Sequence, residues 1–247
     1  MLVEVAWARL GDAHDGLLAL LDPVERARYD ATAGPADRGR FLVGCALSRL
    51  LLGESLGVPP ADVPLRRVCP RCGGPHGKVR LDLPDRSSVS LAYDLSVTHS
   101  GALVGVAVCR GARVGLDVEE ADAALDVDSA ARTALSARES AALYALPPEE
   151  RKPAFLRTWT RKEAVLKALG VGLHAPLRAL EVSPADAPPA VVAWPDRLGA
   201  GPAPGMADLT VDGGHPAALA VTGCGTAGVR VVERAGSGAV SAYGRPA

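Results

Sequence analysis

Two acidic residues stand two positions apart in the otherwise apolar segment 114–119 (VGLDVE). Alternating apolar and acidic residues predict a β-strand, in which Asp117 and Glu119 point to the same face. Two residues of strand span roughly 6.6 Å, so two flexible carboxylates can converge on one ion. Carboxylate oxygens suit Mg²⁺, which completes its shell with water and substrate phosphates. Taken alone, the pattern is more often the polar face of an edge strand.

A third acidic residue, Glu163, follows about forty positions later in a segment that predicts a helix. At helical spacing Trp159, Glu163 and Lys167 lie on one stripe, with Lys162 beside it. A carboxylate flanked by two lysines could complete a metal site and also hold phosphates. The alternative is an ordinary Glu–Lys pair on a solvated helix face, worth only about 0.2–0.5 kcal/mol.

Hydroxyl and imidazole groups gather in residues 95–101 (LSVTHSG), where a predicted strand ends in a turn. Donors at such a turn, among them Thr98 and His99, can bind a phosphate. The alternative is a turn histidine whose ring is satisfied by nearby backbone.

A C-x-x-C pair, Cys69 and Cys72, stands four residues before His76. This is half of a zinc knuckle with a possible third ligand. A closed structural site needs a fourth ligand, and the sequence has no second C-x-x-C. The favoured interpretation is a glycine-rich loop with two reduced thiols, and we expect no stoichiometric zinc.

The elements that must position these residues divide between two halves of the chain. Each half combines a few strands with one long helix, which predicts an α+β fold of two similar lobes. We expect a lobe of residues 1–113, a lobe of residues 114–234 and a disordered tail of residues 235–247. The first lobe is predicted to hold a basic helix opening at residue 22, a helix over 36–54, a loop over 59–77 and strands over 3–8, 91–97 and 103–109. The second is predicted to hold strands over 113–119, 180–182, 190–194, 217–222 and 229–233 and helices over 136–145 and 149–169.

Composition narrows the class of protein. Hydrophobic residues make up 48% of the 247 residues, which is enough for a substantial core. The net charge of −1 lacks the basic excess of a nucleic-acid binder. The N-terminus does not resemble a secretory signal, and no apolar run approaches the ~20 residues of a membrane span. The sequence therefore predicts a cytoplasmic protein that partners neither nucleic acid nor membrane.

Together these motifs resemble those of the surfactin-type (Sfp-type) 4′-phosphopantetheinyl transferases. That family has G-x-D-x-E followed some forty residues later by W-x-x-K-E-A-x-x-K, matched here by residues 115–119 and 159–167. Its serine/histidine turn, arginine-led helix and G-K-P loop resemble residues 98–100, 40–44 and 77–79. The resemblance covers about residues 20 to 182.

Three positions depart from the family pattern. Thr98 stands where serine is usual, and Val79 replaces a proline. Glu25 lies where a basic residue often helps to bind the coenzyme, which leaves Arg28 in that stretch.

The resemblance implies a reaction and a catalytic site. Asp117, Glu119 and Glu163 would hold Mg²⁺, with Mn²⁺ as a possible substitute, against the pyrophosphate of coenzyme A. Asp117, Glu163 and Lys167 would be catalytic, with Lys162 assisting. Glu163, or a water on the metal, would accept the proton of a carrier serine. That serine attacks the β-phosphate, and adenosine 3′,5′-bisphosphate leaves.

The resemblance also implies the partners. The expected partners are coenzyme A and apo acyl or peptidyl carrier proteins of fatty-acid, polyketide or nonribosomal-peptide synthesis. Two pseudo-two-fold lobes in one chain, with the active site in the cleft between them, imply a monomer. Seven residues are expected to bind the coenzyme: Arg28, Arg40, Lys78, Thr98, His99, Lys162 and Lys167.

Three other readings of the sequence compete with the transferase. They are a non-catalytic protein that binds coenzyme A or a carrier, a zinc-ribbon-like nucleic-acid module and a metal-dependent phosphohydrolase. The intact set of three acids argues against the first, and the missing second ligand pair against the second. The serine/histidine turn and the Arg40 helix favour the transferase over the third.

Overall fold

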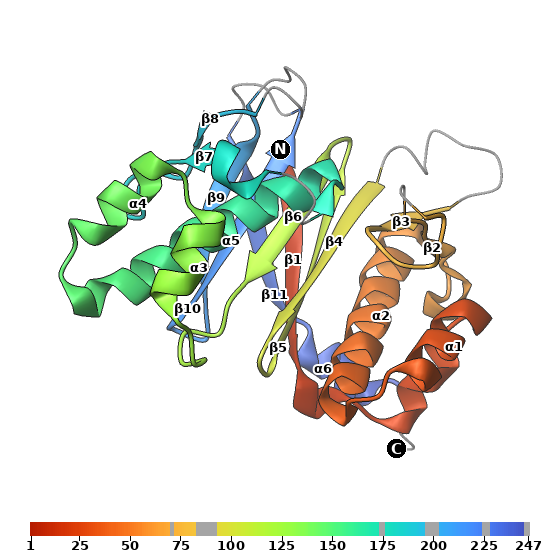
Figure 1. Ribbon diagram of the computed structural model, residues 1–247. Helices are drawn as coiled ribbons and strands as arrows, with labels where there is room; N and C mark the ends of the chain where they lie inside the picture. Colours follow the sequence, from red (N-terminus) through yellow and green to blue (C-terminus); the bar gives the residue numbers. More distant parts are fainter. Residues whose placement is uncertain (70–71, 83–92, 173–175, 196–202, 224–227, 245–247) are drawn as a thin grey trace. The chain divides into compact units, whose positions relative to one another are not determined.

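The computed structural model describes residues 1–69, 72–82, 93–172, 176–195, 203–223 and 228–244. The chain divides into two compact units (Figure 1). One comprises Ala112–Arg230 with Met1, and the other comprises Leu2–Gly111 with Val231–Ala247. The predicted α+β class is confirmed, whereas the pseudo-two-fold relation of the two halves stays a prediction.

The unit built from Leu2–Gly111 and Val231–Ala247 contains a four-stranded sheet in the order β11-β1-β5-β4. Its strands are β1 (Leu2–Arg9), β4 (Tyr93–Ser100), β5 (Leu103–Arg110) and β11 (Arg230–Ala235), and β5 runs antiparallel to both β1 and β4. Strand β4 covers the described part of the strand expected over 91–97, and residues 91 and 92 lie outside the described residues. The unit also holds α1 (Pro23–Ala31), α2 (Pro35–Leu56) and the hairpin of β2 (Leu65–Arg67) and β3 (Val79–Leu81), with 3-10 turns at Leu10–Asp12, Asp15–Leu20 and Pro60–Asp62.

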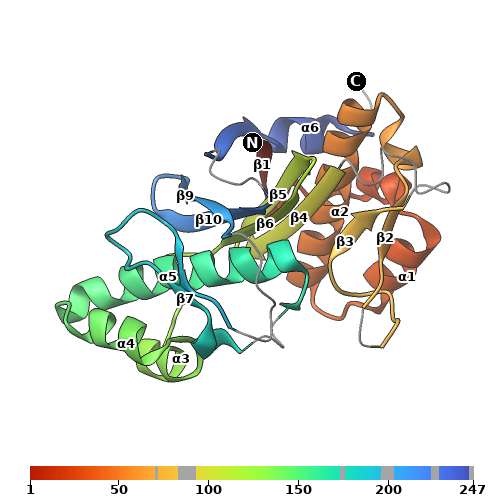
Figure 2. The ribbon, with the colours of Figure 1, turned by 90° about the horizontal axis from the view of Figure 1, so that it is seen from above.

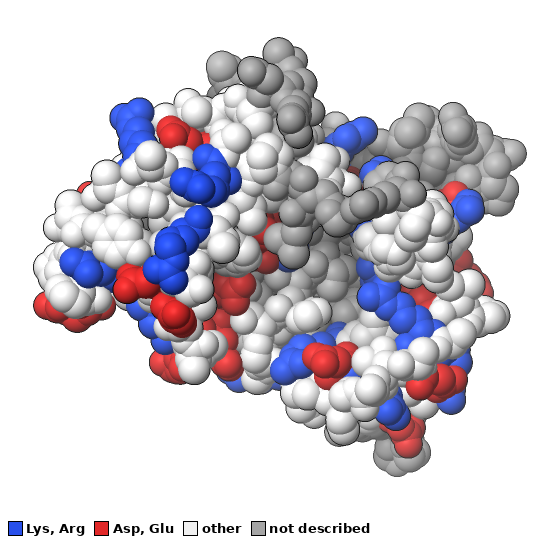
Figure 3. Space-filling model, in the orientation of Figure 1, with Lys and Arg blue, Asp and Glu red and all other residues white. Residues whose placement is uncertain are grey.

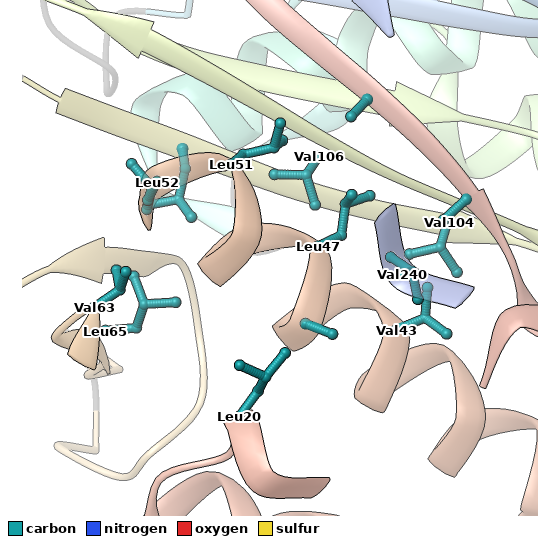
Figure 4. Packing of buried hydrophobic residues seen from close by; sticks show 14 of the residues in the cluster. Leu20, Val43, Leu47, Leu51, Leu52, Val63, Leu65, Val104, Val106 and Val240 are labelled. Carbon is teal, nitrogen blue, oxygen red and sulfur yellow. The ribbon is translucent and has the colours of Figure 1, made fainter. Parts of the chain in front are cut away.

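Helix α2 is the centre of this unit. Pro35 occupies its first turn, and it ends at Gly57, whose φ of +68° lies in the left-handed region that glycine tolerates. Its apolar side chains pack on β5, where Val43 and Leu47 meet Val104 and Val106 (Figure 4). The core therefore sits between this helix and the sheet.

A buried cation joins α2 to α1. Arg49 is 1% exposed, and it donates to the Glu25 carboxylate at 2.7 Å and to Asp22 at 3.2 Å. Asp22 and Glu25 also form the capping box that begins α1. Glu25, which departs from the family pattern in sequence, is thus held inside the fold by Arg49.

The unit of Ala112–Arg230 contains a three-stranded antiparallel sheet in the order β6-β10-β9. Its strands are β6 (Arg113–Val118), β9 (Gly205–Val211) and β10 (His215–Thr222). The long helix α5 (Pro148–Leu169) lies along the sheet, against β6 and β10, and α3 (Val127–Ala134) and α4 (Ala137–Tyr144) lie beside α5 (Figures 1 and 2). A small pair of strands, β7 (Glu181–Val182) and β8 (Val191–Ala193), and a 3-10 turn at Leu177–Ala179 complete it.

Within the helix predicted over 136–145, Ser136 and Glu139 form a capping box at the start of α4. The sequence did not predict α3, β2, β3 or β9. Strands of three residues, such as β2 and β3, carry too little periodic pattern to be distinguished from loops.

The prediction of a disordered tail is wrong for residues 237–242. Ser237–Ala242 form α6, whose Val240 is fully buried against the α2 core. Ser237 and Ser241 both donate hydrogen bonds to the Asp12 carboxylate, at 2.6 and 3.1 Å. These contacts lie more than 220 residues away in sequence, so no local pattern could announce them; residues 245–247 lie outside the described part.

Strand β11 also departs from the expected division, because it pairs in the sheet of β1 rather than with the second half.

Among the described residues, every helix is too short or too polar to cross a membrane.

Candidate active site

Helix α5 packs directly on β6 because Gly115 has no side chain. A Cβ atom at Gly115 would lie 1.9 Å from the carbonyl oxygen of Ala164 and 2.4 Å from the backbone nitrogen of Ala168. Only glycine allows this approach of helix backbone to strand. The contact brings the turn of α5 that carries Glu163 against the strand that carries Asp117.

The acidic residues of β6 and α5 lie within electrostatic range of one another. Asp117 and Glu163 are 5% and 8% exposed, and Lys167, one helical turn after Glu163, donates to Asp117 Oδ1 at 2.6 Å. Burial and the charge of Asp117, with a smaller contribution from Glu119, raise the pKa of Glu163 to about 7, although the charge of Lys167 opposes the shift. Two of the acids are therefore close enough to disfavour ionisation of the third.

The donor set fits a hard divalent cation. Oε1 of Glu163 is buried and has no hydrogen-bond partner among the described residues. A buried carboxylate oxygen in that state costs free energy unless a cation or a proton satisfies it. Asp117 on β6, Glu119 directly after this strand and Glu163 on α5 offer carboxylate oxygens, the type of ligand that Mg²⁺ accepts.

Glu119 is positioned by Trp159, which donates from Nε1 to Oε1 of Glu119 at 2.9 Å. Trp159 is itself stacked on Phe155, with ring centroids 6.2 Å apart. The sequence placed Trp159 on the same helical stripe as Glu163 but assigned it no contact. Its spacing of four residues from Glu163 was the signal that could have suggested this role.

The backbone after β6 is held by residues that the sequence did not single out. The backbone nitrogen of Glu119 donates to the Pro216 carbonyl at 3.0 Å, and that of Ala121 donates to Nδ1 of His215 at 3.1 Å. His215 lies 94 residues from its partner, so no sequence spacing pointed to it.

Residues 113–209, which include this site, match the family described as the 4′-phosphopantetheinyl transferase superfamily. The chain is 33% identical over 210 residues to 4′-phosphopantetheinyl transferase HetI of Nostoc sp., a match that spans 85% of this chain and 81% of that protein. This chain belongs to the 4′-phosphopantetheinyl transferase superfamily. The predicted membership is thus confirmed for the superfamily, and the surfactin-type subfamily stays a prediction.

Two further comparisons cover less of the transferase. It is 35% identical over 141 residues to 4′-phosphopantetheinyl transferase AcpT of Salmonella typhimurium, or 57% of this chain and 66% of that protein. The holo-[acyl-carrier-protein] synthase structure of Thermotoga maritima matches 44% of this chain and 62% of its own length, with 23% identity and a TM-score of 0.38.

The predicted role of Lys162 in coenzyme binding is wrong. Lys162 is fully buried, and its Nζ donates to the Ala134 carbonyl at 2.8 Å and pairs with the Glu139 carboxylate. Burial lowers the pKa of Lys162, and the hydrogen bond and charge of Glu139 oppose that shift. Because each helical residue turns about 100°, Lys162 faces away from Glu163 and towards α3 and α4.

In the other unit of the transferase, Arg40 lies beside the turn between β4 and β5. Its Nε donates to the Gly101 carbonyl at 2.7 Å, and its guanidinium also pairs with Asp37 at 2.6 Å. The side chain keeps 20% of its surface exposed. Since α2 begins at Pro35, Arg40 stands in its second turn, past the free N–H groups of the first turn.

The turn residues Thr98 and His99 differ in exposure. They are neighbours on β4, so their side chains point to opposite faces. Thr98 is 2% exposed, whereas His99 is exposed to solvent. Of the two, His99 is the one that a coenzyme could reach without rearrangement.

Lys78 and Arg28 are also engaged within this unit. Lys78 forms an ion pair with Asp94 that is mostly buried. The Arg28 guanidinium lies over the Phe41 ring, 4.9 Å from its centroid, and donates to the Pro75 carbonyl at 3.4 Å. Burial and the charge of Arg67 lower the pKa of Arg28.

Arg67 is a candidate that the sequence did not reveal. Its guanidinium lies 5.9 Å from the same Phe41 ring, and its buried Nε has no hydrogen-bond partner among the described residues. Arg28, Phe41 and Arg67 line a cavity of about 210 Å³. Two arginines around one aromatic ring make this cavity attractive to an anion.

A larger cavity, of about 640 Å³, lies between α4, the first half of α5 and the β7–β8 segment. Asp117, Glu119 and Glu163 are not among the residues that line it. On the face drawn in Figure 3, Lys and Arg residues alternate with Asp and Glu residues rather than forming a single basic field.

Proposed function

We propose that this protein transfers the 4′-phosphopantetheine group of coenzyme A to a serine of an apo acyl or peptidyl carrier protein. The observation that carries the proposal is that Asp117 on β6 and Glu119 directly after it both raise the pKa of Glu163 on α5, while Lys167 of α5 donates to Asp117. Family membership supports the same reaction, since the family transfers phosphopantetheine from coenzyme A to carrier proteins.

Asp117, Glu119 and Glu163 are the residues that we propose hold Mg²⁺. The buried Oε1 of Glu163 and the all-oxygen donor set support this assignment. A bound Mg²⁺ supplies charge neutralisation at the pyrophosphate of the coenzyme. Trp159, by fixing Glu119, acts as a positioning residue.

Glu163 is also a proposed proton acceptor. The pKa of about 7 belongs to the metal-free carboxyl, and a bound cation would lower it, so either Glu163 or a water on the metal would accept the proton. The carrier serine oxygen forms a bond to the β-phosphorus, and its proton passes to that acceptor. The bond from that phosphorus to the bridging oxygen breaks, and adenosine 3′,5′-bisphosphate leaves with the oxygen. Lys167 stabilises the negative charge that develops there.

Recognition of the remaining coenzyme phosphate requires cations away from the acids, because like charges repel. Arg28 and Arg67 border one cavity, and Arg40 and His99 lie at the end of β4. We propose these four as the candidates for the 3′-phosphate. Lys78 remains a candidate only if the coenzyme displaces it from Asp94.

The test combines the purified protein with coenzyme A, Mg²⁺ and apo carriers of fatty-acid, polyketide and nonribosomal-peptide origin. Mass spectrometry of each carrier should show the gain of one phosphopantetheine group. A chelator should abolish the gain, and added Mg²⁺ or Mn²⁺ should restore it. Asp117→Asn serves as the inactive control.

Two outcomes contradict the proposal. One is that no carrier gains mass under any metal condition. The other is transfer that persists in chelator, which would remove the role given to the three acids.

Sedimentation of the active protein tests the predicted monomer.

A further inference from the structure

The loop between β2 and β3 brings together three side chains that can bind a metal. One ligand atom from each of Cys69, Cys72 and His76 lies within 4.8 Å of the other two. The Cys72 Sγ and His76 Nε2 atoms are 2.9 Å apart. The sequence alone favoured a loop without metal, because it could not show whether His76 turns back to the two thiols.

Backbone hydrogen bonds fold the loop into this arrangement. The Gly73 nitrogen donates to the Cys69 carbonyl, and the Cys69 nitrogen donates to the Gly74 carbonyl, both at 2.9 Å. Gly73 and Gly77 have φ of +70° and +96°, in the region that favours glycine. The ends of the loop are held together by β2 and β3, where Arg67 is paired with Val79.

The spacing suits one tetrahedral ion. Two atoms bound to a single zinc ion, at about 2.3 Å for sulfur and about 2.0 Å for nitrogen, lie roughly 3.5–3.8 Å apart. The three ligand atoms are at most 4.8 Å apart, and the Cys72–His76 contact is shorter, at 2.9 Å. Side-chain shifts of about 1 Å would bring these separations to the values of a zinc site. Neither cysteine forms a disulfide.

The donors identify the metal class. Two thiolates and an imidazole favour Zn²⁺, whereas Mg²⁺ takes oxygen ligands. The three residues belong to a different unit from Asp117, Glu119 and Glu163, so the two metal sites use separate ligands.

We propose that Cys69, Cys72 and His76 bind one zinc ion and leave its fourth coordination position to water or another ligand. Cys72 and His76 are exposed, so the fourth position is open to solvent. The ion would fix the loop between Cys69 and His76, and Pro75 of this loop accepts the hydrogen bond of Arg28. This site goes beyond the proposed transfer reaction and does not depend on it.

The first test is a zinc count. The protein is purified without a histidine tag under reducing conditions, incubated with Zn²⁺, dialysed and analysed by inductively coupled plasma mass spectrometry. We expect about one zinc per chain, falling below about 0.2 in Cys72→Ser and His76→Ala. Two controls should keep their zinc: Cys109→Ala, at a thiol outside the loop, and Asp117→Asn, in the acidic site.

The second test uses Co²⁺ in place of zinc. The wild type should show a thiolate-to-cobalt charge-transfer absorption, which Cys69→Ser should weaken and Cys69→Ser/Cys72→Ser abolish. Circular dichroism checks that each variant is folded. Fewer than about 0.2 zinc per chain in the reconstituted wild type, or zinc content unchanged in the loop variants, overturns the proposal. A Cys69–Cys72 disulfide that persists under reducing conditions also overturns it.

Discussion

Three consecutive charged residues of α5 differ in whether the fold supplies a partner for their charge. Arg161 and Lys162 are fully buried and paired: Arg161 donates to Asp208 at 2.6 and 3.0 Å, and Lys162 pairs with Glu139. Glu163, the next residue, is 8% exposed, and its Oε1 lacks a hydrogen-bond partner among the described residues. Burial is therefore similar, and what differs is whether each charge is compensated within the fold.

Charge compensation distinguishes residues that stabilise the fold from residues whose charge a bound ligand would compensate. Removing either partner of a buried, hydrogen-bonded ion pair lowers the stability of the fold, because the other charge stays buried without compensation. A cluster of like charges lowers stability and is retained where a cation or substrate completes it. Five measurements test this distinction, beginning with the largest expected effect.

Glu163→Gln should lower the turnover of phosphopantetheine transfer by about 10²–10⁴-fold, because it removes a proton acceptor and a metal ligand together. Coenzyme binding should change far less. Single-turnover mass spectrometry gives the rate, and Glu149→Gln, on the same helix, is the control. Near-normal turnover in Glu163→Gln would remove this residue from the site.

Lys162→Met should lower the free energy of unfolding by about 3–5 kcal/mol, since it leaves the Glu139 carboxylate buried without its cation. Urea unfolding measures the loss, and Lys152→Met on the same helix should cost little. The Michaelis constant of the folded variant for coenzyme A should stay unchanged. A stable Lys162→Met protein with weakened coenzyme binding would reverse the assignment of Lys162.

Arg40→Ala should raise the Michaelis constant for coenzyme A about tenfold to a hundredfold, as expected for a charged hydrogen bond of about 1.5–3 kcal/mol. With dephospho-coenzyme A the same change should have little effect, because the phosphate is already missing. Arg38→Ala, from the same helix, is the control. Equal losses with both substrates would make Arg40 structural, like Arg161.

Trp159→Phe should raise the Mg²⁺ concentration needed for half-maximal activity by about tenfold, because Glu119 loses the hydrogen bond that orients it. The phenyl ring keeps most of the packing against Phe155. Trp7→Phe is the matched control, because the Trp7 indole donates its hydrogen bond, at 2.8 Å, to Glu233, which is not one of the three acids. An equal effect in both variants would argue for general destabilisation.

Glu163→Gln should raise the melting temperature of the metal-free protein above neutral pH. The folded pKa of Glu163, about 7, exceeds that of an ordinary glutamate, so its favourable contribution is complete below about pH 4.5 and is lost as pH rises through 7. The amide variant escapes that loss, with a gain on the order of 1 kcal/mol. Thermal unfolding in chelator at pH 5 and pH 8 should show the gain only at pH 8. A stability loss at pH 8 would mean that Glu163 is compensated within the fold.

The sequence by itself determined the motifs and most of the regular elements. Asp117 and Glu119 share a strand face because alternation is a local property, and α5 follows from its periodicity and its terminal Gly170. The superfamily followed from the resemblance of these motifs to those of a known family.

Tertiary structure decided which charges are compensated. Lys162 and Glu163 are adjacent in the sequence, but the lysine forms an ion pair with Glu139, which lies 23 residues away. Likewise Asp12 holds α6 from more than 220 residues away, and the folded loop brings His76 to Cys72. Periodicity specifies which side chains share a face of an element, whereas their partners depend on which distant segment packs there, and that is a property of the whole fold.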